Sequence, residues 1–137
     1  MTGNAEEKVR TIMKITGKIV RGVEESKDFL SIPWVDQQLS EKLHFNAYKG
    51  TLNIMVDDPE VQRNLKRQGK DRLVHETEGF CDALVFRGSL NNTFACGVIL
   101  PLVPVYDECL LEIVAPVHLK KTLGLNDGDI VTLELYL

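Results

Sequence analysis

Alternation between apolar and polar positions is the clearest regular pattern in this chain, and it predicts a protein built mainly of short strands. Side chains of a strand point alternately to the two faces of a sheet, so alternation over a short run favours a strand. Segments with this pattern, or with a short apolar run between turn residues, are 12–20, 29–32, 50–56, 83–86, 94–103, 109–114 and 130–135. Six or seven short strands favour a closed barrel or a sandwich.

Three shorter segments carry helical signals and are expected to lie between the strands. Pro33 suits the first position of a helix, where the missing N–H costs nothing. The apolar residues that follow it at helical spacing are Trp34, Val35, Leu39 and Leu43. Residues 58–60 (Asp-Pro-Glu) have the N-cap and acidic first turn of a second helix, which should end near Gly69. Pro116 is expected to open a third helix, which Gly124 closes.

The length of the chain fits a single domain. It has 137 residues, and domains usually hold about 100–200. Residues 1–10 are polar and acidic and are expected to form a lead-in, whereas residues 11–137 are expected to form one barrel domain. Residues 70–80 give no clear helix or strand signal. No internal repeat or low-complexity tract interrupts this organisation.

Composition and charge argue against several classes of protein. The formal net charge is −4, which disfavours a nucleic-acid partner because such a partner usually requires a basic face. No apolar run approaches the length of a membrane span, and the polar N-terminus does not resemble a secretory signal. The three cysteines have no metal-type spacing and lie among apolar neighbours, so they are expected to be buried, reduced thiols. We therefore expect a cytoplasmic protein, either a monomer or a small homo-oligomer, without nucleic-acid or membrane partners.

The first candidate for chemistry is the strand that contains Thr51 and Asn53. A strand places these two residues on the same face, because side chains alternate with period two. A hydroxyl and an amide oxygen are hard ligands that suit Mg²⁺, which takes few protein ligands and retains water or phosphate oxygens. Gly50 would allow a close approach of backbone or ligand. Taken alone, the same pair also fits two polar residues that face water.

Two further segments have the character of anion sites. The loop 22–27 follows a strand, and glycine-containing loops can bind phosphate through backbone N–H groups, although this loop has one glycine and two glutamates. The segment 112–120 places a carboxylate, Glu112, on a strand and then a proline at the expected start of a helix, where free N–H groups can hold an anion or a polar base edge. Alone, each segment also fits an ordinary turn or corner.

Together and in this order, these segments resemble the archaeal CTP-dependent riboflavin kinases. The resemblance covers nearly the whole chain, from about Thr16 to the C-terminus. Its specific motifs are Gly-Thr-Leu-Asn at 50–53 and Glu-Ile-Val-Ala-Pro at 112–116. Weaker blocks of similarity lie at 17–22, 29–33, 96–101, 119–120 and 126–129.

The resemblance implies a fold, a reaction and a metal. The fold would be a six-stranded cradle-loop β-barrel, mainly β with short helices. The reaction would transfer the terminal phosphoryl group of CTP to riboflavin, giving CDP and FMN. Thr51 and Asn53 would hold Mg²⁺. Such chemistry depends mainly on positioning and on neutralising charge.

The resemblance also implies two sets of ligand-binding residues. On the flavin side these are Glu112 and the position of Pro104. The residues expected to wrap the nucleotide phosphates are Gly22, Val23, Glu24, Glu25, Ser26 and Lys27. Those expected to recognise cytosine, largely through backbone groups, are Val117, His118, Leu119 and Lys120.

Two positions depart from the family pattern. The loop 22–27 has fewer glycines than the family's phosphate loop, although Ser26 and Lys27 still offer phosphate ligands. Pro104 stands where the family has a threonine that helps to hold the flavin product. Riboflavin is therefore the expected acceptor, and a CTP-dependent kinase of another small hydroxylated acceptor is the alternative.

An alternative from another class is a non-catalytic barrel that binds DNA or a protein partner. Its support is the corner at 123–129, a pattern also found in swapped-hairpin transcription factors. That alternative leaves Thr51 and Asn53 unexplained. The catalytic residues stay open, because spacing does not rank the three candidates for a general base, which are Asp107, Glu108 and Glu112.

Overall fold

The computed structural model describes residues 11–22 and 25–137 and consists mainly of strands. Within these residues it has seven strands and four short helices. In chain order they are β1 (Ile12–Val20), α2 (Glu25–Leu30), α3 (Pro33–Leu43), β2 (Leu52–Met55), α4 (Glu60–Gln68), β3 (Asp71–Leu73), β4 (Ala83–Leu90), β5 (Phe94–Pro101), β6 (Leu110–Val114), α5 (Leu119–Leu123) and β7 (Ile130–Tyr136).

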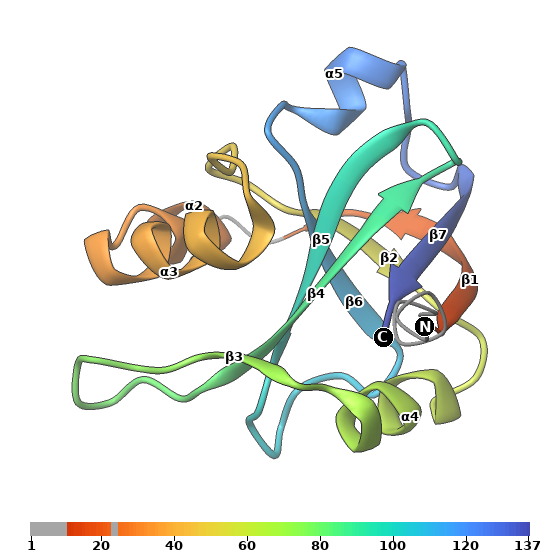
Figure 1. Ribbon diagram of the computed structural model, residues 1–137. Helices are drawn as coiled ribbons and strands as arrows, with labels where there is room; N and C mark the ends of the chain where they lie inside the picture. Colours follow the sequence, from red (N-terminus) through yellow and green to blue (C-terminus); the bar gives the residue numbers. More distant parts are fainter. Residues whose placement is uncertain (1–10, 23–24) are drawn as a thin grey trace, which may run out of the picture.

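Six of the strands close into an antiparallel barrel, as the resemblance implied. The order of the sheet is β3-β4-β5-β6-β2-β1-β7, and a further pairing between β4 and β7 closes the six strands from β4 to β7 into a ring (Figure 1). Strand β3 pairs only with β4 and extends the sheet beyond the barrel. Closure leaves the six barrel strands without a free edge, so their backbone hydrogen bonds are satisfied within the fold.

The closing pair depends on a glycine inside β4. Gly88 lies opposite Leu135 in the β4–β7 ladder. A Cβ atom built at Gly88 would lie 2.0 Å from the carbonyl oxygen of Glu134 and 2.8 Å from Cδ2 of Leu135. No side chain fits at the first of these distances without movement of the backbone. Only a glycine therefore permits β4 and β7 to approach this closely.

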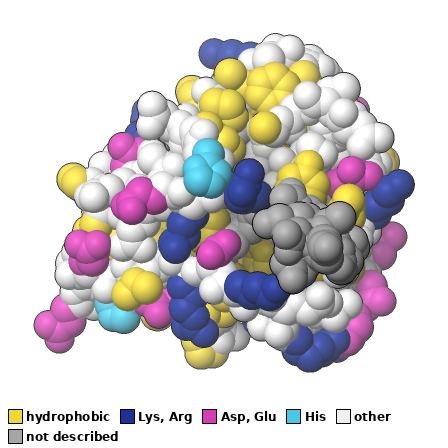
Figure 2. Space-filling view, viewed as in Figure 1, with side chains coloured by type: hydrophobic (Ala, Val, Ile, Leu, Met, Phe, Trp, Pro, Cys, Tyr) yellow, Lys and Arg dark blue, Asp and Glu magenta, His cyan; other side chains and the backbone are white. Residues whose placement is uncertain are grey.

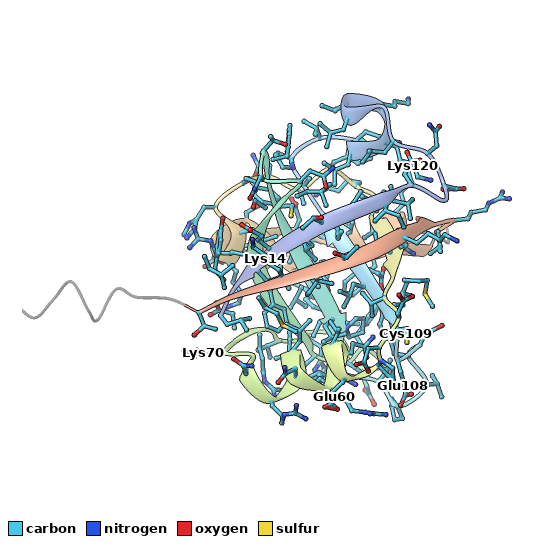
Figure 3. All side chains as sticks on the ribbon, turned by 90° about the vertical axis from the view of Figure 1, so that its right-hand side faces the viewer. Lys14, Glu60, Lys70, Glu108, Cys109 and Lys120 are labelled. Atoms are coloured by element: carbon cyan, nitrogen blue, oxygen red, sulfur yellow. The ribbon has the colours of Figure 1, made fainter. Side chains whose placement is uncertain are left out.

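Two apolar cores lie on the two sides of the barrel wall. The larger core fills the barrel interior and includes Ile54, Phe86 and Leu133. The second lies between helices α2 and α3 and the outer face of the wall, where Leu39 packs near Ile99. Helix α4 lies at one end of the barrel and α5 at the other (Figures 1 and 3).

Several predicted elements are confirmed. Strand β1 has the predicted bounds, and α3 begins at Pro33 and buries three of the residues predicted for its apolar face. Residues 58–60 open α4 as expected, because the carboxylate of Asp58 accepts a hydrogen bond of 2.9 Å from the backbone N–H of Glu60. Gly124 ends α5 with a φ of 65°, a conformation that glycine adopts without strain.

Two predictions about local structure are wrong. Residues 29–32 are not a strand: Phe29 and Leu30 end helix α2, because Ser26, Phe29 and Leu30 share one helical face and Leu30 is buried in the second core. The last helix begins at Leu119 and not at Pro116, since residues 116–117 form a bend before it. The described residues thus contain one helix more than the three predicted.

The surface shows no large region of one charge on the face seen in Figure 2. Lys and Arg side chains lie among Asp and Glu side chains there. Within residues 11–22 and 25–137, no helix has the length and apolar character needed to cross a bilayer.

Gly88→Ala is predicted to destabilise the barrel severely. Because the new methyl group would overlap the carbonyl of Glu134, β4 and β7 must separate locally, and we expect a loss of about 3 kcal/mol in the free energy of unfolding. Denaturant titration measures this loss. The neighbouring substitution Ser89→Ala, also in β4, is the control and should change stability by less than about 1 kcal/mol. Equal stability of the two variants would contradict the close packing of β4 and β7.

Candidate functional site

Two cavities meet beside the beginning of β2. One, which we call the polar cavity, has a volume of about 380 Å³ and lies near α5. The other, the apolar cavity, has a volume of about 430 Å³ and lies near α2 on the outside of the barrel wall. Ser26 and Thr51 line both cavities. A reaction between ligands in the two cavities would therefore take place next to these side chains.

Strand β2 directs its side chains to two different environments. Leu52 and Ile54 point into the barrel core, whereas Thr51 and Asn53 are on the other face. Asn53 is 5% exposed, and its Oδ1 accepts a hydrogen bond of 2.7 Å from the hydroxyl of Thr51. In the two ladders of β2, Asn53 lies opposite Val20 of β1 and opposite Glu112 of β6. The predicted placement of both residues on one face is thus found in the structure.

The oxygens of Thr51 and Asn53 fit a small divalent cation by chemistry and spacing. Adjacent ligands of an octahedral Mg²⁺ lie about 2.1 Å from the metal and hence about 3 Å from each other. Oγ1 of Thr51 and Oδ1 of Asn53 are 2.7 Å apart. The described residues contain no cluster of three or more His, Cys, Asp or Glu side chains suited to a metal. A cation here would therefore need further oxygens from water or phosphate.

Glu112 is the acidic residue of this site. Its carboxylate accepts a hydrogen bond of 2.7 Å from the hydroxyl of Tyr106, and both residues line the apolar cavity. Burial raises the pKa of Glu112 above the usual range for a glutamate, while the hydroxyls of Tyr106 and Thr51 act in the opposite direction. Burial and the neighbouring Glu112 charge raise the pKa of Tyr106 as well. Tyr106 thus remains a hydrogen-bond donor at neutral pH.

The other two acidic candidates lie away from both cavities. Asp107 and Glu108 are exposed in the turn before β6. The Asp107 carboxylate accepts a hydrogen bond from the backbone N–H of Cys109, and Glu108 lies 3.7 Å from Arg63 of α4. Figure 3 shows Glu108 near α4, at the end of the barrel opposite Lys120 of α5. Of these three acidic residues, only Glu112 lines one of the two cavities.

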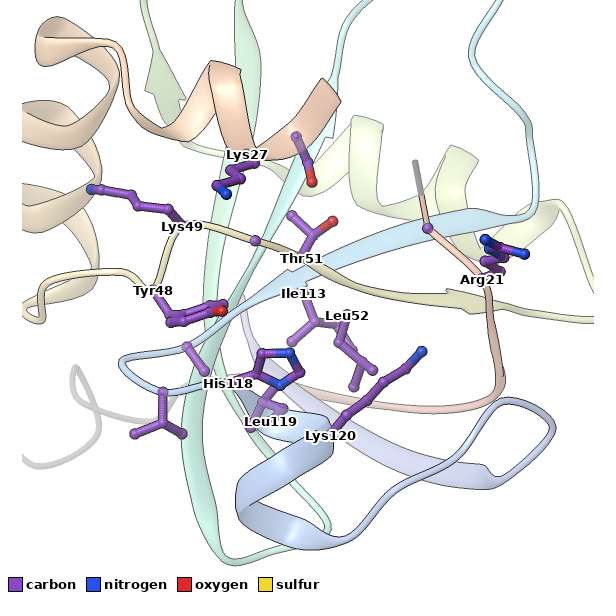
Figure 4. Close-up of a pocket in the computed structure, with 15 residues that line it drawn as sticks. Arg21, Lys27, Tyr48, Lys49, Thr51, Leu52, Ile113, His118, Leu119 and Lys120 are labelled. Carbon is purple, nitrogen blue, oxygen red and sulfur yellow. The ribbon is translucent and has the colours of Figure 1, made fainter. Parts of the chain in front are cut away.

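Basic side chains surround the polar cavity. Figure 4 shows Lys27 and Lys49 on one side, Lys120 on the other, and Thr51 between them. Lys49 forms an ion pair with Asp36, and Lys120 forms one with Asp127. Lys27 and Arg21, which also line the cavity, have no carboxylate partner among the described residues. These two cations can therefore neutralise a multiply charged anion.

A glycine and two aromatic rings complete the polar cavity. Gly22 lies against the Asn53 amide, since a Cβ built at Gly22 would be 3.2 Å from Nδ2. The rings of Tyr48 and His118 pack edge to face with centroids 5.0 Å apart. Nδ1 of His118 accepts a hydrogen bond from the backbone N–H of Lys121, so the neutral ring carries its proton on Nε2. These rings give a flat ligand an aromatic surface and a polar edge.

The structure brings together most, but not all, of the residues predicted for ligand binding. Those that line the polar cavity are Gly22, Ser26, Lys27, Val117, His118, Leu119 and Lys120. Val23 and Glu24 lie outside the described residues, and Glu25 begins α2. Pro104 is exposed and does not line the apolar cavity, whereas its neighbours Val103 and Tyr106 do.

Sequence reasoning missed residues in both cavities. In the polar cavity these are Arg21, Tyr48 and Lys49, which lie inside or directly beside segments that resemble the family but had no role assigned to them. In the apolar cavity they include Phe80 and Tyr106. Phe80 lies in the segment 70–80, where no periodic pattern indicated a structure.

Comparisons with known proteins give a consistent result. Residues 19–135 match a family model whose abbreviated name is CTP-dependent riboflavin kinase. The description of that family is a domain of unknown function, DUF120. A riboflavin kinase of Methanothermobacter thermautotrophicus is 38% identical over 114 residues, which cover 83% of this chain and 92% of that protein. One from Sulfurisphaera tokodaii is 31% identical over 132 residues, covering 92% and 97%. One from Saccharolobus solfataricus is 29% identical over 136 residues, covering 90% and 74%.

Glu112→Gln is predicted to change how stability depends on pH. Because burial raises the pKa of Glu112 in the folded state, its contribution to stability is complete below about pH 4.5 and is lost as the pH rises through the folded pKa. The glutamine variant mimics the neutral form and lacks this loss. In metal-free buffer we expect it to be more stable than the unsubstituted protein at neutral pH, with the difference disappearing toward about pH 4. Unfolding titrations across this range measure the difference, and parallel profiles would contradict the burial of a charged Glu112.

Proposed function

Because the chain belongs to the family of CTP-dependent riboflavin kinases, we propose that it transfers the terminal phosphoryl group of CTP to riboflavin. In this reaction the terminal ribityl hydroxyl of riboflavin forms a bond to the terminal phosphorus of CTP. The bond between that phosphorus and the bridging oxygen breaks, so the products are FMN, CDP and a proton. The activity is thus that of a phosphotransferase with an alcohol as acceptor.

The observation that carries this proposal is the meeting of two chemically different cavities at Thr51. A kinase must hold an anionic donor and its acceptor so that a hydroxyl faces the terminal phosphorus. The polar cavity supplies cations and the apolar cavity supplies a surface for a largely apolar ring system. Their shared wall carries hard oxygen ligands, which is where the transferred group would have to lie.

On the donor side, the polar cavity fits a nucleoside triphosphate. Arg21 and Lys27 are free of carboxylate partners within the described part of the chain, so they suit the phosphates. Tyr48 and His118 offer their rings to the base. Residues 117–120 would recognise cytosine by backbone groups. A backbone carbonyl can accept a hydrogen bond from the amino group of cytosine, and a backbone N–H can donate one to the neighbouring ring nitrogen. The wrong base would leave such a group unpaired, which costs about 1–3 kcal/mol, or about tenfold to a hundredfold in preference.

On the acceptor side, the apolar cavity fits riboflavin. Glu112 and Tyr106 form the polar end of this cavity beside Thr51. A ribityl chain that lies along this end can donate hydrogen bonds to the carboxylate and place its terminal hydroxyl near the shared wall. Ile99, which lies opposite Glu112 in the β5–β6 ladder, and Leu110 add an apolar wall to this cavity that is suited to a flavin ring.

Thr51 and Asn53 are the proposed ligands of Mg²⁺, which would neutralise charge on the phosphates when bound. The hydroxyl of Thr51 now donates to Asn53, so it must rotate its proton away for both oxygens to face a cation. The burial of Asn53 and its place between β1 and β6 hold its amide in position for this role.

A second acceptor is favoured by one observation. Pro104 lacks the hydroxyl with which the family's threonine is expected to hold the flavin, and Pro104 is exposed in this structure. Losing one hydrogen bond costs about 0.5–1.5 kcal/mol, which weakens riboflavin binding by up to about tenfold. Another small hydroxylated compound with an apolar ring is therefore the alternative acceptor for the same donor site.

One experiment tests the proposal directly. The protein is incubated with Mg²⁺, riboflavin and each of the four nucleoside triphosphates in turn, and FMN is separated by chromatography. We expect FMN with CTP and at least about tenfold less with ATP. Equal rates with CTP and ATP would contradict the donor assignment. Binding of CTP without formation of FMN would point to the other acceptor.

Asn53→Ala is predicted to reduce turnover by at least about a hundredfold, because it removes a metal ligand at the junction of the cavities. The matched control is Asn46→Ala. Asn46 also accepts a hydrogen bond from a hydroxyl, that of Ser40, but it is exposed and lines neither cavity. Rates are measured over a titration of Mg²⁺. If Asn53→Ala turns over as fast as the control at every Mg²⁺ concentration, the metal assignment is wrong.

A further inference from the structure

Three aromatic rings pack together outside the barrel, at the side of the apolar cavity. The ring centroids of Phe29, Trp34 and Phe80 are 5.7–6.3 Å apart in all three pairs. Phe29 and Phe80 line the cavity, whereas Trp34 lies behind them and does not. Phe80 is 37% exposed, although a large ring next to an apolar cavity would normally be covered. This cluster thus presents part of an aromatic surface to whatever occupies the cavity.

Phe80 is carried by an arm, residues 74–82, that helix α3 holds in place. Gln38 donates a hydrogen bond of 2.8 Å to the carbonyl of Val74 and accepts one of 2.7 Å from its N–H. The indole N–H of Trp34 donates to the hydroxyl of Thr77 at 2.9 Å. These contacts fix the arm against α3 although the two segments are far apart in the sequence.

The tip of the arm is a tight turn that sets the direction of Phe80. The N–H of Phe80 donates to the carbonyl of Thr77 at 3.3 Å, and Gly79 between them has a φ of 95°. A positive φ at the third residue is typical of a type II turn and favours glycine. The ring of Phe80 is therefore held at the cavity before any ligand binds, which reduces the entropy lost on binding.

We propose that Phe80 determines specificity for the acceptor by stacking on its planar ring system. The inference rests on the proposed function for the identity of the acceptor as riboflavin. Aliphatic side chains of the barrel wall, Ile99 and Leu110, line the same cavity, and Glu112 and Tyr106 form its polar end. A flat aromatic ligand with a hydroxylated tail matches this arrangement, since its ring is covered by Phe80 while the tail reaches Glu112.

The chain contains an internal reporter for this contact, because Trp34 is its only tryptophan. Trp34 touches Phe80 and emits where flavins absorb, so riboflavin stacked on Phe80 should quench its fluorescence. We would titrate riboflavin into the protein without nucleotide and follow Trp34 emission. The expected result is saturable quenching, with an affinity about tenfold weaker in Phe80→Ala and nearly unchanged in Phe80→Tyr, which keeps the ring.

Val74→Ala is the matched control. Val74 lies on the same arm and is 50% exposed, but it does not line the apolar cavity, so this variant should bind riboflavin as the unsubstituted protein does. In turnover assays, Phe80→Ala should raise KM for riboflavin by about tenfold and leave KM for CTP unchanged. A merely structural role of Phe80 would instead affect both constants or the stability of the fold.

A second measurement needs no substitution. The prediction that all three cysteines are buried is wrong for Cys81, which is exposed and lines the apolar cavity. Cys96 is buried with its pKa raised to about 12, so Cys81 is the more reactive of these two thiols. Riboflavin should slow alkylation of Cys81 at concentrations that quench Trp34. Riboflavin binding without quenching and without protection of Cys81 would overturn the inference, as would full affinity in Phe80→Ala. No riboflavin binding by a protein that binds CTP would instead overturn the proposed acceptor itself.

Discussion

The closing of the barrel between β4 and β7 is the constraint on which the other elements depend. It exists because Gly88 has no side chain to meet the carbonyl of Glu134. Closure fixes β7 between β4 and β1, and the antiparallel ladders then fix β1, β2 and β6 in turn. The register of β2 against its neighbours, which decides which residues meet at the junction of the two cavities, is thus set by a closed ring of strands.

Strand β2 links the stability of the fold to the geometry of the site. Leu52 and Ile54 are buried in the barrel, and a shift of one residue would move them out of the core and bring Asn53 into it. A shift in the register of β2 would expose two large apolar side chains and is therefore unfavourable, which keeps Asn53 opposite Glu112. The polar residues of the junction need little stabilisation of their own, because the core on the other face of the same strand holds them.

The sequence predicted those parts of the fold that local patterns determine. The alternation in β1, the proline that opens α3 and the shared face of Thr51 and Asn53 follow from short-range rules, and the structure agrees with them. The short run at 29–32, apolar except for Ser31, is compatible with a strand or a helix by its pattern alone. In the structure Phe29 and Leu30 end helix α2 and pack with residues of α3 in the second core. Phe80 could not be placed, because its arm is held by contacts with α3 between residues that are 36 to 43 positions apart in the chain.

The two cavities differ in how far they depend on the barrel. The polar cavity, which is the proposed donor side, is lined in part by β2, the end of β1 and the start of α5, and these residues are fixed by strand ladders and by the main core. The apolar cavity, which is the proposed acceptor side, is built partly on α2, on the arm that carries Phe80 and on the loop that includes Val103 and Tyr106. Loops tolerate substitution better than strands of a closed core, because less buried surface depends on them. Pro104 lies in such a loop and is exposed. The proposed acceptor side is therefore where this chain can differ from its relatives at little cost in stability, while the positions of Thr51 and Asn53 are constrained by the barrel.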